Sequence, residues 1–223
     1  MSRKIFTLIV LLCLTGLTAG VPEAKVHGQI VCFGDSITFG AQVDGQSWVW
    51  YLQQENLPGV EFINAGRSGR KTADTAELAP VLLKYPRADY YLIFLGVNDL
   101  KNGNEALEDK CVSNMRWMIA RIRQTDPGAR IVLLSPTDIN TQDMSPVNVK
   151  KQYNQNTRKS LAGLEIKYRA LALEQHTGFI SLLHTVSKND YADGLHPDRK
   201  GQQQIAAAVW KGLNKLDQKN IRR

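Results

Sequence analysis

Short apolar segments alternate along the chain with longer stretches in which apolar residues recur every three or four positions. The short segments have the length of strands, and several are continuous apolar runs, which is typical of strands covered on both faces. The longer stretches have the spacing of helices with one buried face. Strands are predicted at residues 29–33, 60–64, 90–95, 130–134 and, from a weaker pattern, 178–182.

The helical spacing is clearest from Leu107 to Ile122, from Tyr153 to Leu171 and from Ile205 to Leu216. We expect the aromatic and methionine side chains on these stripes to be packing residues rather than parts of a site. Repeated strand–helix units of this length favour parallel strands with helices on both faces of the sheet. The pattern therefore predicts an α/β fold with a mostly parallel, five-stranded sheet.

The N-terminus has a pattern of its own. Arg3 and Lys4 precede an apolar run over residues 5–14, and small residues follow at 18–20, which is the layout of a secretory signal peptide. A membrane anchor is the alternative, but roughly ten apolar residues are too few for a bilayer that needs about twenty. We therefore predict a signal peptide over 1–20 and an exported protein, periplasmic or secreted. No stable membrane anchor is expected in the mature chain.

The rest of the chain, residues 21–223, is long enough for one well-buried domain and too short for two comfortable ones. Cys13 lies in the predicted leader, so the mature chain keeps only Cys32 and Cys111, which cannot form a disulfide framework. We expect both to be buried as small hydrophobic residues. The mature chain is mildly basic, but its cations are spread without interleaved aromatic residues, so no nucleic-acid partner is predicted.

A sharp turn is predicted where the first strand ends, at Gly34-Asp35-Ser36-Ile37-Thr38. Gly34 breaks the buried strand, so Ser36 would stand at its carboxyl end beside backbone N–H groups not yet committed to a helix. This is where a nucleophile would be placed. Turns are also rich in Gly, Asp and Ser for purely local reasons, so this segment alone does not identify a nucleophile. That interpretation requires a base and oxyanion donors from other segments.

A second segment, Asp193-Gly194-Leu195-His196-Pro197, supplies a base. An Asp and a His three positions apart in a tight loop can lie on one side of the chain. The carboxylate can then hold the imidazole Nδ1–H and stabilise the imidazolium that forms when a serine is deprotonated. A metal site would need a third ligand, and no other histidine has ligand spacing with this pair. No metal is therefore predicted.

Two more segments supply donors for an oxyanion. Gly66 follows the second predicted strand and can present a bare backbone N–H, while Asn98 follows the third and can present a side-chain amide. Because binding crevices in parallel sheets lie at the carboxyl ends of the strands, Ser36, Gly66 and Asn98 can converge there. Acyl transfer requires donors of this kind where negative charge develops.

Taken in order, these four segments resemble the GDSL or SGNH hydrolases: Gly-Asp-Ser-Ile, Asn-Ala-Gly, Gly-Val-Asn-Asp and Asp-Gly-Leu-His-Pro. The resemblance covers almost the whole mature chain, from residue 30 to about 215. It implies a three-layer, flavodoxin-like α/β/α sandwich and a serine esterase that needs no cofactor. It further implies Ser36 as nucleophile, His196 as general base, Asp193 as the partner of His196, and an oxyanion hole of Ser36 N–H, Gly66 N–H and Asn98 Nδ2.

For the substrate, we expect a small acyl group, most simply acetyl, on a carbohydrate outside the cytoplasm, so that the partner is a small-molecule or oligosaccharide ester. Export, the lack of a long apolar lid or insertion, and the polar loop 135–148, predicted to line the mouth of the site, favour this hypothesis. The alternatives are a lipase, lysophospholipase or thioesterase on the same scaffold, and an O-acyltransferase using the same residues. A carbohydrate-binding module with a vestigial site is the non-enzymatic alternative.

Three residues are candidate substrate contacts. Arg67 and Arg70 follow the oxyanion glycine and could meet a uronate carboxylate, or could instead pair with Asp74 or Glu77. The Arg-Ser pair after that glycine also resembles the rhamnogalacturonan acetylesterase branch. Trp48 could stack on a sugar face, but the expectation for it and for its neighbours Trp50 and Tyr51 on the same helix is that they are packing residues.

Overall fold

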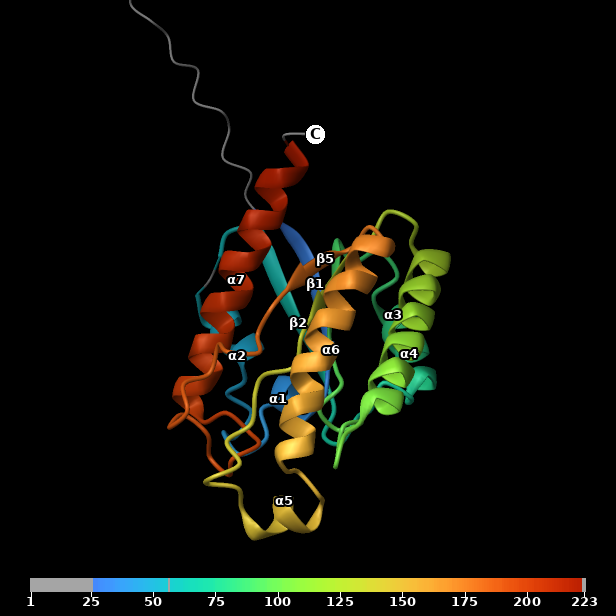
Figure 1. Ribbon diagram of the computed structural model, residues 1–223. Coiled ribbons are helices and arrows are strands. Elements are labelled where there is room, and N and C mark those ends of the chain that lie inside the picture. The colour runs from blue at the N-terminus through green and yellow to red at the C-terminus, as the bar shows by residue number, and fades with distance from the viewer. Residues whose placement is uncertain (1–25, 56, 222–223) are drawn as a thin grey trace, which may run out of the picture.

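The computed structural model of the protein describes residues 26–55 and 57–221 (Figure 1). The predicted signal peptide over 1–20 and Cys13 lie outside the described residues. A five-stranded sheet in the order β2-β1-β3-β4-β5 forms the centre, and every neighbouring pair of strands is parallel. The predicted parallel sheet is therefore confirmed. The strands are β1 (Gly28–Gly34), β2 (Val60–Gly66), β3 (Tyr90–Phe94), β4 (Arg130–Leu134) and the short β5 (Gly178–Ile180).

Helices cover both faces of this sheet. Figure 1 shows α7 on one side, and α3 and α4 on the other. They are α1 (Ser36–Phe39), α2 (Trp48–Gln54), α3 (Leu78–Lys84) after the 3-10 turn η1 (Thr75–Glu77), α4 (Glu105–Thr125), α5 (Pro146–Lys150), α6 (Gln155–Glu174) and α7 (Arg199–Ile221).

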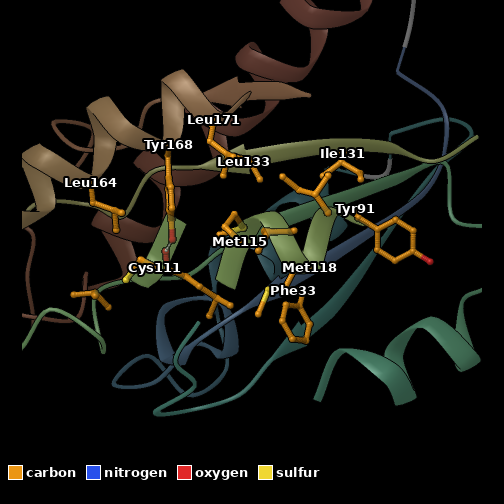
Figure 2. Close-up of a cluster of buried hydrophobic side chains, with 14 of the residues drawn as sticks. Phe33, Tyr91, Cys111, Met115, Met118, Ile131, Leu133, Leu164, Tyr168 and Leu171 are labelled. Atoms are coloured by element: carbon orange, nitrogen blue, oxygen red, sulfur yellow. Dashed lines mark hydrogen bonds between the residues drawn. The ribbon is translucent and has the colours of Figure 1, made fainter. Parts of the chain in front are cut away.

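Alternate strand residues face opposite helical layers, as the pleat of a strand requires. Val31 and Phe33 of β1 belong to a cluster with α3, α4 and α6, whereas Ile30 and Cys32 belong to a cluster with α2 and α7. The first cluster contains most of the predicted stripes of α4 and α6, and Figure 2 shows Met115 and Met118 of α4 with Tyr168 of α6 among its side chains. The three-layer α/β/α sandwich is thus built on two apolar cores, one on each face of the sheet.

The two described cysteines, Cys32 and Cys111, are buried and unpaired, as predicted. Tyr153 was predicted to begin the helical stripe that ends at Leu171. In the structure α6 begins at Gln155, and Tyr153 lies in the turn before it. Within the described part of the chain, no helix has both the length and the apolar character needed to cross a membrane.

The register of the strands aligns their carboxyl ends. Gly34 is the register partner of Gly66 on one side and of Phe94 on the other. The segments that follow β1, β2 and β3 therefore leave the sheet side by side. This edge is where the candidate site lies.

Candidate active site

Ser36 is held at the start of a single turn of helix. Asp35 precedes α1 and its Oδ1 accepts a hydrogen bond from the backbone N–H of Ile37 at 2.9 Å, which caps the turn. Gly40 closes the same turn in the left-handed conformation, with a φ of 92°. Ser36 is only 6% exposed. Its position is therefore determined by a short, capped element rather than by a free loop.

Ser36, His196 and Asp193 form a continuous hydrogen-bonded series. His196 Nε2 lies 3.0 Å from Ser36 Oγ, and His196 Nδ1 lies 2.9 Å from Asp193 Oδ2. The other carboxylate oxygen of Asp193 accepts backbone hydrogen bonds from Leu195 at 3.0 Å and His196 at 2.8 Å. Both oxygens of Asp193 thus hold the imidazole ring and the chain that carries it.

The environment of Asp193 favours its ionised form. Burial acts to raise the pKa of the Asp193 carboxyl, but the hydrogen bonds from the ring and backbone of His196 and from the backbone of Leu195 outweigh it. The pKa of Asp193 therefore lies well below its usual range. A carboxylate is thus available at neutral pH to stabilise a positive charge on His196.

The loop after β4 supports the Asp193 segment from behind. Ser145 N–H and Asn148 Nδ2 both donate to the Asp193 carbonyl oxygen, at 3.1 and 3.2 Å, and Asn140 N–H donates to the Gly194 carbonyl at 2.8 Å. Gly194 has a φ of +78°, and a Cβ there would lie 2.6 Å from Met144 Cα. Only glycine permits this close approach, so the loop and the Asp193 segment are packed as one unit.

Gly66 packs directly against the turn that carries Ser36. A Cβ on Gly66 would lie 2.3 Å from Phe39 N and 2.7 Å from the Thr38 carbonyl carbon, so a side chain is excluded. The expectation of a bare N–H is wrong, however, because Gly66 N–H donates to Asn64 Oδ1 at 2.9 Å. An oxyanion at this position would have to share or displace that bond.

Asn98 is 6% exposed and is held at both ends of its amide. Its Oδ1 accepts a hydrogen bond from the Tyr153 hydroxyl at 2.7 Å, and its Nδ2 donates to the Arg70 carbonyl at 3.1 Å. Since a primary amide has two N–H donors, one remains for another acceptor. Tyr153 was missed in the sequence, where its spacing assigned it to the packing stripe. The only available signal was the general need of a buried tyrosine hydroxyl for a partner.

Two carboxyl groups beside the site were also missed, Asp35, which is buried, and Asp99, which is half-buried. Burial raises the pKa of Asp35 to about 7, against the lowering effects of the Ile37 N–H and of the charge on His196. Burial likewise raises the pKa of Asp99, whose oxygens accept hydrogen bonds from the backbone and hydroxyl of Thr72. Burial therefore favours the protonated form of Asp35 far more than in a solvent-exposed aspartate.

The structure corrects two of the three predicted substrate contacts. Trp48 is completely buried, and its indole N–H donates to Thr38 Oγ1 at 3.3 Å, so the predicted stacking on a sugar is wrong. Arg70 is 5% exposed and pairs with Glu77 at 2.9 Å, so it is not free to meet a substrate carboxylate. The alternative, an ion pair with Glu77, is the one the structure contains.

Arg67, the third predicted contact, is half-exposed. It pairs with Asp74 at 3.3 Å and with Glu77 at 2.5 Å. Its contact with a substrate stays a prediction. The described residues contain no group of three or more His, Cys, Asp or Glu side chains that could hold a metal ion.

A cavity of about 370 Å³ lies at the loop that supports Asp193. It is surrounded by the loop after β4, the start of α6 and the segment after β5. Of the predicted site residues, none is among those lining it. Its walls are mostly polar: Asp138, Ile139, Asn140, Thr141, Gln142, Gln155, Arg158, His184, Val186, Lys188 and Tyr191.

The sequence is similar to known proteins over most of its length. Residues 32–204 match the model of the GDSL-like lipase/acylhydrolase family. The protein named "Uncharacterized esterase YxiM" from Bacillus subtilis (strain 168) is 23% identical over 168 residues, covering 73% of this chain. The chain spans only 43% of the length of that relative.

Solved structures of two esterases share the fold. A Mycobacterium protein described as "M. Smegmatis Aryl Esterase" has a TM-score of 0.71 at 21% identity, and a carbohydrate acetylesterase from Sinorhizobium meliloti has 0.72 at 18% identity. Each comparison covers 84% of this chain and 99% of the other. At such identities, these similarities establish the architecture of the chain and leave its substrate open.

Proposed function

From the premise that this chain belongs to the GDSL-like lipase/acylhydrolase family of carboxylic ester hydrolases, we propose that it cleaves esters through an acyl-enzyme on Ser36. One observation carries the proposal. The Ser36, His196 and Asp193 side chains are connected at 3.0 and 2.9 Å, which is hydrogen-bond reach for a nucleophile, its base and the group that orients the base.

The geometry supports a two-stage reaction. Ser36 Oγ attacks the ester carbonyl carbon and its proton passes to His196 Nε2, while Asp193 stabilises the imidazolium. When the tetrahedral intermediate collapses, the bond to the alcohol oxygen breaks and His196 returns the proton to that oxygen. Water then attacks the acyl-enzyme, with His196 again accepting a proton, and the acid and free Ser36 are released.

For the oxyanion we propose the backbone N–H groups of Ser36 and Gly66 and the free N–H of Asn98 Nδ2. Asn98 is the strongest candidate of the three, because its amide is clamped by Tyr153 and Arg70 in advance of any reaction. Gly66 would contribute by sharing the N–H now bonded to Asn64. Preorganised donors of this kind typically account for a factor of about 10² to 10³ each in kcat.

The catalytic proposal is tested with Ser36→Ala and p-nitrophenyl acetate. We expect the variant to lose most of its turnover and to keep a small residual activity that comes from the oxyanion hole and from substrate binding. A fluorophosphonate should add once to the wild-type protein and not to Ser36→Ala, measured by intact mass. Unchanged hydrolysis and labelling in the variant would contradict Ser36 as the nucleophile, whereas a wild-type protein without hydrolysis or labelling would favour the binding module.

For the substrate, we propose a small acyl group, most simply acetyl, on a carbohydrate outside the cytoplasm. The predicted signal peptide supports export, and the polar cavity supports a hydroxyl-rich partner. Gln142, His184 and Lys188 line that cavity, and no hydrogen bond from their side chains is present among the described residues. An acetylesterase of Sinorhizobium meliloti shares the fold, which is compatible with this substrate class.

Exposed apolar side chains favour a second candidate, a lipase, lysophospholipase or thioesterase. Phe39, on the turn that carries Ser36, is 52% exposed. Val147 and Val149 are 61% and 58% exposed on α5, which is tied to the Asp193 carbonyl through Asn148. These three side chains could contact a longer acyl chain.

A series of p-nitrophenyl esters from acetyl to octanoyl separates the two candidates. The acetyl proposal requires the highest kcat/KM with acetate, and faster turnover of octanoate would contradict it. Release of acetate from a panel of acetylated polysaccharides would then identify the sugar. If an added alcohol outcompetes water for the acyl-enzyme, the protein is an acyltransferase instead.

A further inference from the structure

Arg70 lies in the turn that follows β2, at a position where a cation is unexpected. Its side chain is 6% exposed, and its guanidinium lies over the Phe33 ring, 4.1 Å from the ring centroid. The backbone turns sharply to place it there, with Arg70 N–H donating to the Arg67 carbonyl at 3.2 Å. Burying a charge is costly unless its hydrogen bonds are satisfied, so the contacts of Arg70 indicate why it is kept.

The guanidinium joins the carboxyl ends of two strands. Its Nη1 donates to the Gly34 carbonyl at 2.5 Å and to the Ala65 carbonyl at 2.6 Å, while its Nε donates to Glu77. Gly34 ends β1 two residues before Ser36. The Ala65 carbonyl belongs to the same peptide group as the Gly66 N–H. The cation therefore fixes the orientation of that peptide plane, because the bond between carbonyl and amide is rigid.

The backbone of Arg70 reaches the third donor. Its carbonyl oxygen accepts the hydrogen bond from Asn98 Nδ2 at 3.1 Å. A single residue thus contacts the strand end before Ser36, the peptide group of Gly66 and the amide of Asn98. These are the three places from which the oxyanion donors were proposed above.

We propose that Arg70 is the positioning residue of the oxyanion hole, acting through Gly34, Ala65 and Asn98 rather than by touching substrate. This inference rests on the proposed function. The guanidinium holds the strand ends in place before the reaction begins, and its positive charge polarises the Ala65–Gly66 peptide so that the N–H is a stronger donor. Glu77 is ion-paired with the guanidinium on one side only. The buried carboxyl of Asp35 is the other acidic group that interacts electrostatically with Arg70.

The test compares Arg70→Met and Arg70→Lys with wild type. Methionine keeps much of the bulk and removes all donors, whereas lysine keeps the charge but has no planar fork for two carbonyls and Glu77 together. We measure kcat and KM for p-nitrophenyl acetate, and inhibition by phenylboronic acid. Ser36 Oγ bonds to boron while its proton passes to His196, which gives a negatively charged, tetrahedral adduct that resembles the intermediate.

We expect Arg70→Met to lower kcat/KM at least tenfold, mainly through kcat, and to raise the Ki of phenylboronic acid by a similar factor. Arg70→Lys should recover part of both losses. The matched control is Arg130→Met. Arg130 also stacks on an aromatic ring, 4.0 Å from Tyr90, and pairs with an acid, Asp217, at 2.7 Å, but at the amino end of β4. Its loss should lower stability and leave kcat/KM and Ki within about twofold.

Folded Arg70 variants with wild-type kcat/KM and Ki would overturn the proposal. If neither variant folds, the proposal is tested on the wild-type protein, by measuring the nitrogen chemical shifts of its arginine side chains with and without phenylboronic acid. The Arg70 Nε resonance should shift when phenylboronic acid binds, while that of Arg130 stays in place, and an unshifted Arg70 resonance overturns the inference. Failure of the proposed function is distinguishable, since Ser36→Ala would then keep its activity and phenylboronic acid would not inhibit wild type.

Discussion

The Tyr153 hydroxyl donates a 2.7 Å hydrogen bond to Asn98 Oδ1, although the two residues are 55 positions apart. Both side chains are buried. The bond fixes which way the amide faces, and therefore where its remaining N–H points. A hydroxyl that packs inside the core is in this way part of the candidate site.

The first prediction concerns this bond. Tyr153→Phe should lower kcat for p-nitrophenyl acetate up to about tenfold with little change in KM, because one hydrogen bond is worth about 0.5–1.5 kcal/mol. Tyr168→Phe is the matched control. Tyr168 is equally buried, but its hydroxyl makes only a 3.4 Å contact with the Leu95 carbonyl. Equal effects of the two variants on kcat would show that Tyr153 acts by packing alone.

The second prediction concerns the orientation of the base. Asp193→Asn should lower kcat by a factor of about 10³ to 10⁴, since the amide can hold His196 in the wrong tautomer and carries no charge to stabilise the imidazolium. Asp198→Asn is the control, two residues beyond His196. Asp198 accepts from the Gly201 N–H at 2.9 Å, a role that asparagine performs equally well. The kinetics of both variants should be measured at the same pH, and a small effect of Asp193→Asn on kcat would contradict the assigned role.

The third prediction concerns close packing. Gly66→Ala should push the turn of α1 away from β2, because the added Cβ would lie 2.3 Å from Phe39 N. We expect about 1–3 kcal/mol loss in the free energy of unfolding, with a larger proportional loss of kcat/KM. Gly128→Ala is the control, where the nearest atom to the added Cβ is Asp126 Oδ1 at 3.4 Å. Denaturant unfolding and kinetics on the same samples would check both, and an active, stable Gly66→Ala protein would refute the packing argument.

The fourth prediction concerns Asp35 and pH. Burial raises the pKa of Asp35 to about 7, whereas in the unfolded chain it is near 4. Between these values the folded state binds the proton more tightly, so this group makes the protein less stable as pH rises from 4 to 7. Asp35→Asn keeps a cap for Ile37 and removes the titration. The free energy of unfolding of wild type relative to Asp35→Asn should therefore fall across this range, by at most about 1.4 kcal/mol per pH unit, and then level off.

Denaturant unfolding of both proteins at pH 4, 5.5, 7 and 8 provides the measurement. Other titrating groups are common to wild type and variant, so most of their contribution cancels in the difference. A difference that stays constant from pH 4 to 8 would show that folding does not raise the pKa of Asp35.

The order of strands and helices was predictable because buried positions are apolar, and their spacing along the chain differs between strands and helices. Apolar runs predicted all five strands, and the spacing of apolar side chains predicted the faces of α4, α6 and α7 that enter the core. The residues of the candidate site were also predictable. Ser36, Gly66, Asn98 and His196 each stand in a short segment next to the end of a predicted element, and parallel strands bring such segments to one edge.

What could not be predicted was the full set of partners of the buried polar groups. The spacing assigned Tyr153 to packing, and the turn after β2 left Arg70 as either a substrate contact or the partner of Asp74 or Glu77, with no sign of its bonds to two strand ends. The structure makes the first an anchor of Asn98 and the second a buried bridge between β1 and β2. Trp48 was a candidate for stacking on sugar until its complete burial excluded that role.

By itself, the sequence determined the elements of the sandwich and predicted the candidate nucleophile, base and acid, since these depend on residue types and on spacing over a few positions. Only the tertiary structure decided that Ser36 and His196, 160 positions apart, lie 3.0 Å from each other, and that Asn64 already occupies the Gly66 N–H. The physical reason is that hydrogen bonds require positions correct to a few tenths of an ångström. Positions that accurate arise only when distant elements pack together.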